Sequence, residues 1–326
     1  MNPTGCSADV LPLADDGEVR NGSAEMPSID CGGLQGPQGV GDMMCAIGAN
    51  PMKIVRILTA ALIIAGLSMP LSSPLRAQQK RKRLLVIGAV KGFQHDSTSQ
   101  AMATLWNLGR ESALWDTYIK TDTQWITKKK LDGNAKNLDY FDAVAFYTTG
   151  ELDMDDEQKA ALLAFVRDDG KGFLGVHSAI DTFYKWPEFG EMTGAYFNEH
   201  PWGTFEAPVI LEDPTNPIVR HFPSAFTTWD EIYQPSKEFS REKVRVLLRL
   251  DETKLDLKNP RVHRTDNDFA VAWLKTYGKG RVFYSTFGHT PESWDRPDVR
   301  KMWLEATKWC LGDITVDTTP RPRPAK

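Results

Sequence analysis

Apolar runs and helical segments alternate along the first half of the domain. A continuous apolar run at 82–90 predicts a strand buried on both faces of a sheet, and residues 113–120 and 141–147 are predicted as the second and third strands. Residues 98–110 and 157–168 are predicted helices, and the second has an apolar face with helical spacing. Strands that alternate with helices predict a doubly wound α/β sheet.

The second half of the chain contains more strands and loops. Its predicted strands are residues 205–211, 218–222, 228–234, 244–250, 269–276 and 281–287, and residues 294–311 form a predicted closing helix. We find no internal repeat. The pattern predicts one α/β domain over residues 82–313, followed by a disordered Pro/Arg-rich tail at 314–326.

The first 77 residues differ in composition from the domain. Residues 1–51 are rich in Gly, Pro, Ser and Asp, so we expect a disordered leader or a start-site artefact, with translation beginning at Met52. Residues 52–77 have a basic start and a short apolar stretch, which predicts a signal peptide. We therefore expect an exported protein, periplasmic or extracellular, with no stable membrane span after signal removal. The alternative is an uncleaved amino-terminal anchor, and amino-terminal sequencing of the precursor tests the start site.

The overall composition is that of an ordinary soluble protein. The chain has 326 residues, of which 41% are apolar and 25% charged, and its formal net charge of −4 argues against a nucleic-acid partner. Only Cys310 lies in the predicted domain, so neither an intrachain disulfide nor a thiolate metal cage can form there. The sequence is compatible with a homo-oligomer as well as with a monomer.

A glycine-bounded apolar strand at 172–176 leads into a turn of small residues. Gly175 and Ala179 flank His177 with the spacing of a strand-turn-helix elbow, in which a strained turn exposes one side chain. Such elbows usually present a nucleophile, whereas an imidazole acts as a base, a ligand or a hydrogen-bond donor. The alternative is a structural histidine buried before a helix-like segment at 180–186.

Three histidines directly follow predicted strands. They are His95, His177 and His289, and parallel strands end at one edge of a sheet, so we expect these side chains to converge. His200 lies in a loop that can reach the same edge. The two remaining histidines, His221 and His263, are predicted to be structural or surface residues.

Convergent imidazoles permit two chemistries. One is a site for a divalent metal such as zinc, with ligands drawn from His95, His177, His200 and His289. The other is proton transfer, because imidazole titrates near neutral pH. The sequence has no His-Glu-x-x-His pair, so the metal hypothesis depends on convergence alone.

Carboxylates near these histidines are further candidates. Asp230 and Glu231 alternate across a predicted strand, and Glu231 is the better site candidate because it shares a face with Trp229 and Tyr233. Asp230 is then expected to be solvated or structural. Glu151 follows the strand at 141–147 and either binds substrate or braces its loop.

Aromatic side chains near the candidate site suit a sugar ligand. Trp202, Tyr233 and Trp294 lie in or beside polar loops, and flat aromatic faces pack well against the C–H surfaces of sugar rings. Most other aromatic residues are expected in the core.

Several of these segments together resemble the ThuA-like (trehalose utilisation) family. They are residues 91–95, 148–151, 175–179, 199–201, 230–233, 278–284 and 288–289. The resemblance implies a flavodoxin-like, class I glutamine amidotransferase-like fold in which His177 stands where the amidotransferases have their nucleophile. Ser178 lies one place beyond that position, which disfavours a serine hydrolase, and Cys310 in the closing helix disfavours an amidotransferase.

The resemblance also suggests a function. Family members are associated with sugar catabolism, in particular with disaccharides oxidised to 3-keto derivatives. We therefore expect isomerisation, elimination or hydrolysis of a keto sugar or glycoside. In this hypothesis His177 or Glu231 removes a proton, and His95, His200 or His289 stabilises the oxyanion, directly or through a metal. His200, Trp202, Tyr233, His289 and Glu151 are the expected substrate contacts. The alternative is a non-catalytic carbohydrate-binding domain.

Overall fold

The computed structural model of the chain describes residues 80–324. The predicted leader at 1–51 and the predicted signal peptide at 52–77 lie outside these residues. Within the described part, none of the helices has the length and apolar character needed to cross a membrane.

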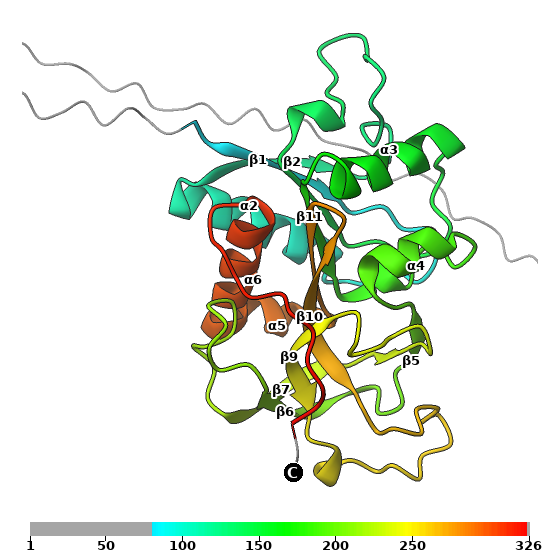
Figure 1. The fold of residues 1–326 in the computed structure, drawn as a ribbon, viewed down its shortest axis with the longest axis vertical. Helices are drawn as coiled ribbons and strands as arrows, with labels where there is room; N and C mark the ends of the chain where they lie inside the picture. The colour runs from blue at the N-terminus through cyan, green and yellow to red at the C-terminus, as the bar shows by residue number, and fades with distance from the viewer. Residues whose placement is uncertain (1–79, 325–326) are drawn as a thin grey trace, which may run out of the picture. The chain divides into compact units, whose positions relative to one another are not determined.

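A nine-stranded mixed sheet forms the centre of the domain (Figure 1). The order of its strands is β2-β1-β3-β4-β11-β10-β9-β6-β7, and β5 and β8 form a separate pair. The strands are β1 (Lys82–Ile87), β2 (Trp115–Lys120), β3 (Ala143–Phe146), β4 (Gly172–Val176), β5 (Phe197–Glu199), β6 (Thr204–Leu211), β7 (Ala225–Glu231), β8 (Gln234–Pro235), β9 (Arg245–Leu250), β10 (Ala270–Tyr277) and β11 (Gly280–Ser285).

The first five strands in this order are parallel. β1 pairs with β2 and β3, and β4 pairs with β3 and β11. Every residue of β3 and β4 is buried, as expected for apolar strands covered on both faces. Counted along the chain, the parallel strands have the order 2-1-3-4-5 of flavodoxin-like sheets. The predicted flavodoxin-like α/β fold is therefore confirmed.

The other four strands continue the same sheet in antiparallel fashion. β10 pairs with β11 and β9, and β6 pairs with β9 and β7. Gly278, with φ 57°, makes the tight turn between β10 and β11, and a Cβ there would lie 2.4 Å from the carbonyl oxygen of Arg167. The doubly wound pattern thus belongs to the parallel half of the sheet.

Helices cover both faces of the parallel half (Figure 1). α2 (Thr98–Ser112), α5 (Pro291–Asp295) and α6 (Pro297–Cys310) pack on one face, and α3 (Asp156–Arg167) and α4 (Pro187–Thr193) pack on the other. Single 3-10 turns occur at Leu138–Tyr140, His177–Ile180 and Glu252–Lys254. Each face has its own apolar core, and the sheet separates the two.

Proline accounts for two differences from the predicted elements. The helix-like segment expected at 180–186 is replaced by the 3-10 turn and by α4, which begins at Pro187. The helix expected at 294–311 is divided into α5 and α6, because Pro297 favours the first position of a new helix. The segment at 218–222 is wrong as a strand, since its backbone forms turn hydrogen bonds back to Asn216.

The Pro/Arg-rich segment is held against the antiparallel half. Arg245, buried on β9, pairs with Asp213 at 2.6 Å and with Asp317 at 2.5 Å, and Arg321 pairs with Asp213 at 3.0 Å. In the structure, Asp317 and Arg321 of the predicted tail therefore form ion pairs with the domain. The composition of the tail gave no sign of buried carboxylates that bind arginine.

Candidate active site

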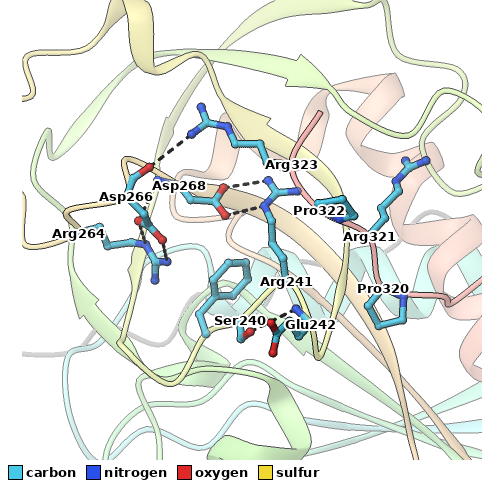
Figure 2. A pocket seen from close by; sticks show the side chains of 11 residues that line it. Ser240, Arg241, Glu242, Arg264, Asp266, Asp268, Pro320, Arg321, Pro322 and Arg323 are labelled. Carbon is cyan, nitrogen blue, oxygen red and sulfur yellow. Dashed lines mark hydrogen bonds and ion pairs between the residues drawn. The ribbon is translucent and has the colours of Figure 1, made fainter. Parts of the chain in front are cut away.

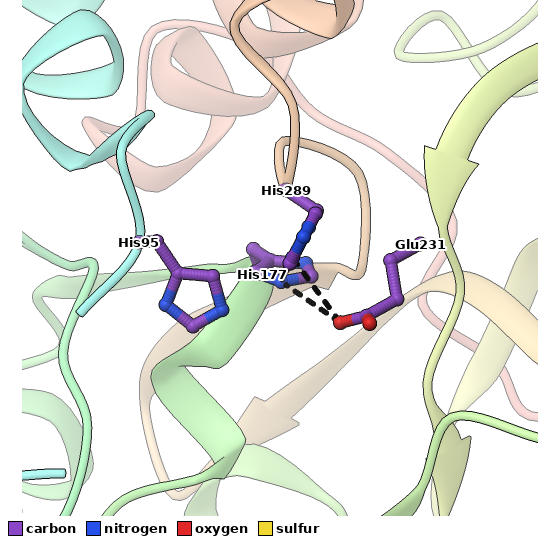
Figure 3. Close-up of side chains that lie close together, drawn as sticks. All are labelled: His95, His177, Glu231 and His289. Atoms are coloured by element: carbon purple, nitrogen blue, oxygen red, sulfur yellow. Dashed lines mark hydrogen bonds and ion pairs between the residues drawn. The ribbon is translucent and has the colours of Figure 1, made fainter. Parts of the chain in front are cut away.

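Four side chains converge beyond the carboxyl ends of the parallel strands (Figure 3). His95 lies in the loop after β1, His177 directly follows β4, His289 lies in the loop after β11, and Glu231 is the last residue of β7. Strands that run parallel end at the same edge, so residues far apart in the sequence meet there. The structure brings together the three histidines that the strand pattern placed at this edge.

In this group, the histidine cluster, one potential ligand atom from each side chain lies within 4.8 Å of the others. His289 Nδ1 is 3.2 Å from His177 Nε2 and 3.2 Å from Glu231 Oε2. Glu231 Oε2 is 3.8 Å from His177 Nε2. The His95 ring packs edge-on against the rings of His177 and His289, with centroid distances of 4.8 and 5.1 Å.

His177 occupies a strained turn, as in an elbow. Its φ is 42°, a left-handed conformation that is unfavourable for a residue with a Cβ. Space around the turn is tight, because a Cβ on Gly175 would lie 3.0 Å from the Tyr284 ring. His177 Nδ1 donates to the carbonyl oxygen of Thr286 at 2.6 Å, which leaves Nε2 as an acceptor facing the cluster. The His177 side chain is fully buried, whereas the elbow analogy predicted an exposed one.

Asp230 holds the loop that carries His289. Its carboxylate is fully buried and accepts hydrogen bonds from Gly288 N at 2.8 Å, His289 N at 3.0 Å and Ser293 Oγ at 2.7 Å. Burial raises the pKa of Asp230 to about 6, against the opposing effect of these hydrogen bonds. Asp230 was expected to be either solvated or structural, and its buried, hydrogen-bonded carboxylate has the structural role.

The loop that carries His95 packs against the loop after β3. Lys91 N donates to the carbonyl oxygen of Thr149 at 2.9 Å, and Gly92 N donates to Thr149 Oγ1 at 3.2 Å. Gly150 has φ 77°, and a Cβ there would lie 2.8 Å from Gly92 N. This close approach of two backbones requires glycine and fixes the path of the chain toward His95.

His95 itself is buried beside Tyr233. Its Nε2 lies 3.4 Å from the Tyr233 hydroxyl, and the Tyr233 ring packs on His177 with a centroid distance of 4.4 Å. Within residues 80–324, the buried Nδ1 of His95 has no hydrogen-bond partner. The nitrogen that faces His177, His289 and Glu231 is Nε2 (Figure 3).

His200 is the most exposed imidazole at the site. Its Nδ1 lies 3.3 Å from Glu231 Oε1 and 3.1 Å from Arg261 Nη2, and a third of its side chain is exposed. His289 is less exposed, and His177 is not exposed at all. A substrate would therefore reach His200 and His289 first.

Burial and charge set different protonation states within the cluster. Burial, and next the neighbouring His289, lower the pKa of His95 to about 4. Burial also lowers the pKa of His177 well below its usual value. Burial acts in the same direction on His289, but the hydrogen bond and charge of Glu231 outweigh it and raise the pKa of His289. His95 and His177 are therefore neutral at pH 7.

The remaining expected site residues have other contacts. Glu151 is exposed and accepts a hydrogen bond from Lys185 N, which is the loop-bracing role. Trp202 packs against Phe205 and Phe269. Trp294 is fully buried and cannot present a face to a sugar. The structure does not bring these three side chains into the histidine cluster.

Of the expected common face, Trp229 and Glu231 belong to β7 and Tyr233 does not. Trp229 is 48% exposed, whereas Glu231 and Tyr233 are buried. β7 ends at Glu231 and β8 begins at Gln234, so the alternation of a single strand does not extend to Tyr233. Glu231 reaches the site because the strand ends there.

Two further residues lie at the site without having been predicted as site residues. Phe93 is 65% exposed, and its ring packs edge-on against His95 with a centroid distance of 4.8 Å. Arg261 pairs with Glu199 at 2.5 Å beside His200. The available signal for Phe93 was its position two residues before His95, in the loop after the first strand. Arg261 belongs to a charged loop whose sequence gives no such signal.

A separate cavity of about 660 Å³ lies between the loop at 239–242, the loop at 264–268 and the carboxyl-terminal segment (Figure 2). None of the histidine cluster lines it. Arg241 there pairs with Glu212 and Asp268, and Arg264 pairs with Asp266. Because these arginines are already neutralised, the cavity offers them little opportunity to bind an anion.

Comparisons with known proteins agree with this architecture. The sequence pattern of the ThuA family, described as trehalose utilisation, matches residues 83–310. A putative ThuA-like protein from Bacteroides uniformis ATCC 8492 has a similar structure, with a TM-score of 0.58, 20% identity and coverage of 71% of this chain and 91% of that one. A putative ThuA-like protein from Parabacteroides merdae ATCC 43184 is similar with a TM-score of 0.56 and 16% identity. The match covers 73% of this chain and 92% of that one. No match was found among curated proteins. The family match spans most of the chain, and the protein belongs to the ThuA family.

Proposed function

We propose that the protein acts on an oxidised sugar by removing a proton from the carbon next to a carbonyl group. The observation that carries the proposal is the position of Glu231, a buried carboxylate with Oε2 3.2 Å from His289 and Oε1 3.3 Å from His200. Carboxylate–imidazole pairs at the entrance of a site transfer protons efficiently near neutral pH. The family description, trehalose utilisation, supports a sugar as substrate.

We assign the exchange of the proton with the sugar to His200. Its Nδ1 lies between Glu231, which only accepts hydrogen bonds, and Arg261, which only donates them. When Nδ1–H faces Glu231, Nε2 is free to accept a proton. When Nδ1 accepts from Arg261, Nε2 carries a proton that it can donate. The same ring can therefore serve as base and as acid in one reaction.

The proposed step balances without a redox partner. The electrons of the broken C–H bond form a carbon–carbon double bond, the carbonyl oxygen becomes an enolate oxygen, and the proton moves to His200. If the carbon that lost its proton bears a hydroxyl group, that hydroxyl proton moves to the enolate oxygen and a proton is returned to the former carbonyl carbon, which completes an isomerisation. Loss of a substituent from the next carbon completes an elimination. The enolate needs a positive charge nearby, which the histidine cluster supplies as protonated His289 or as a bound cation.

The main alternative is carbohydrate binding without catalysis. The packing of the tryptophans supports catalysis over binding alone, because Trp294 stacks on Trp303 inside the core and Trp202 packs against Phe205. Four ionisable side chains brought together in a largely buried site also suit chemistry better than sugar stacking. We retain export as part of the proposal, on the signal-like composition of residues 52–77.

Hydrogen exchange tests the proposal. The full chain is incubated in D2O with 3-keto trehalose, and the hydrogens next to the carbonyl are followed by proton NMR. We expect their signals to disappear at a rate proportional to protein concentration, with or before product formation. Trehalose itself, which lacks the carbonyl, serves as the control and should remain unchanged. Sugar binding without exchange or product, across a panel of 3-keto glycosides, would support the non-catalytic alternative.

A further inference from the structure

The atoms of the histidine cluster have the spacing of metal ligands. A tetrahedral zinc ion with bonds of about 2.0–2.1 Å places neighbouring ligand atoms about 3.3–3.4 Å apart. His289 Nδ1 lies 3.2 Å from both His177 Nε2 and Glu231 Oε2, and the third side of this triangle is 3.8 Å. The three atoms thus form nearly one face of a tetrahedron, and His95 lies within reach of the remaining position.

Hydrogen bonding behind the cluster directs its imidazoles in the same way as in known metal sites. The Nδ1–H of His177 donates to the carbonyl oxygen of Thr286, which fixes the tautomer with a free Nε2 lone pair. Metal ligands commonly have such a second hydrogen bond. Asp230 accepts hydrogen bonds from the backbone of Gly288 and His289 and so fixes the loop that carries the His289 imidazole.

The burial and orientation of His95 give further support. His95 is only 7% exposed, and its Nδ1 lacks a hydrogen-bond partner among residues 80–324. Its Nε2 faces the other three side chains (Figure 3), with only a 3.4 Å contact to the Tyr233 hydroxyl, so this nitrogen can complete the ligand set of a cation.

We propose that His95, His177, His289 and Glu231 bind one divalent transition-metal ion. Three nitrogens and one carboxylate oxygen suit zinc, and the same ligands accept cobalt. Glu231 binds the ion through Oε2, and its Oε1 still faces His200. The ion then supplies the positive charge for the enolate oxygen; this last assignment rests on the proposed function, whereas metal binding does not.

Metal titration tests the site directly. The full chain is treated with a chelator, dialysed and titrated with Zn²⁺ by calorimetry and with Co²⁺ by visible absorption. We expect one ion per chain and a Co²⁺ spectrum typical of tetrahedral coordination. Replacing one ligand, in His177→Ala or Glu231→Gln, should weaken binding by more than the about 10- to 100-fold typical of changes outside the first ligands. His263→Ala is the matched control and should bind as tightly as the wild type.

The outcomes are separable. Failure of the chelator-treated wild type to bind either ion, or equal binding by Glu231→Gln and the wild type, overturns the metal site. If circular dichroism shows that His177→Ala is misfolded, His95→Ala and Glu231→Gln still decide the question. Metal bound without any exchange of the keto sugar refutes the proposed function alone. Exchange that persists in full after chelation refutes the role of the ion in catalysis, whereas the titration alone decides whether the site binds metal.

Discussion

At the scale of single residues, Glu231 is stable in its buried position only because its oxygens are paired. A buried carboxylate without partners is costly, and Glu231 faces His200 through one oxygen and His177 and His289 through the other. The two oxygens therefore connect the exposed part of the site with the buried part. Removing Glu231 would separate proton transfer at His200 from the charge held by the cluster.

Phe93 provides a test of substrate contact at this scale. Its ring is largely exposed beside His95, so Phe93→Ala should leave folding stability unchanged and raise KM for the sugar about 3- to 10-fold, the value of one lost aromatic contact. Steady-state kinetics and thermal unfolding measure the two effects. Trp106→Ala, which removes an exposed aromatic side chain from α2, is the control. An unchanged KM in Phe93→Ala would exclude Phe93 from the sugar site.

Sequence reasoning located some of these residues better than others. Histidines that follow strands could be predicted to converge, because strand direction determines where their ends meet. The reason given for Glu231 holds only in part, because β7 ends at Glu231 and its alternation does not reach Tyr233. Arg261 could not be predicted, because the path of a charged loop depends on packing that no local pattern encodes.

At the scale of elements, the loops after β1 and β3 act as a unit. Gly92 and Gly150 allow the backbones of the two loops to touch. His95 lies three residues after Gly92, so this contact sets its position. Any side chain at position 150 would push the β1 loop away. The position of His95 therefore depends on a residue in a different loop.

Two glycine variants test this dependence. Gly133→Ala and Gly150→Ala both force a Cβ into a left-handed conformation, at a cost of about 1–2 kcal/mol. Only Gly150→Ala adds a clash with backbone, because nothing lies within 4 Å of a Cβ at Gly133. We expect Gly150→Ala to be the less stable in urea unfolding and to lose activity, and Gly133→Ala to remain active. Equal losses in the two variants would contradict the role of the loop contact.

The parallel half of the sheet was predictable at this scale, whereas the details of the other half were not. Continuous apolar runs identify strands covered on both faces, as in β3 and β4. Residues 218–222 have a similar apolar composition but form a turn. Short apolar runs do not distinguish these outcomes, because burial follows from tertiary packing.

At the scale of the whole molecule, ion pairs bind the carboxyl-terminal segment to the antiparallel half. Arg321 pairs with Asp213 at 3.0 Å and Arg323 with Glu252 at 2.5 Å, and both carboxylates are buried. Arg245 also reaches Asp317 in this segment. The segment therefore stabilises a part of the sheet that lies outside the histidine cluster.

Truncation tests this stabilising role. A chain that ends at Val316 lacks these partners and should be less stable by roughly 1–3 kcal/mol, because buried carboxylates lose hydrogen bonds. This corresponds to a fall in Tm of several degrees, at about 2–4 °C per kcal/mol. Arg300→Ala, which removes an exposed pair with Glu111, is the control and should change Tm little. An unchanged Tm in the truncated chain would mean that the segment contributes no stability.

The central claim is that Glu231 serves proton transfer and not sugar binding alone. The most direct measurement compares Glu231→Gln with the wild type in two assays: affinity for 3-keto trehalose by calorimetry, and deuterium exchange next to its carbonyl by NMR. Glutamine keeps the size of the side chain but cannot act as the carboxylate, so we expect exchange to fall by at least about 100-fold with the sugar still bound. Exchange at the wild-type rate in a folded Glu231→Gln protein would contradict the account.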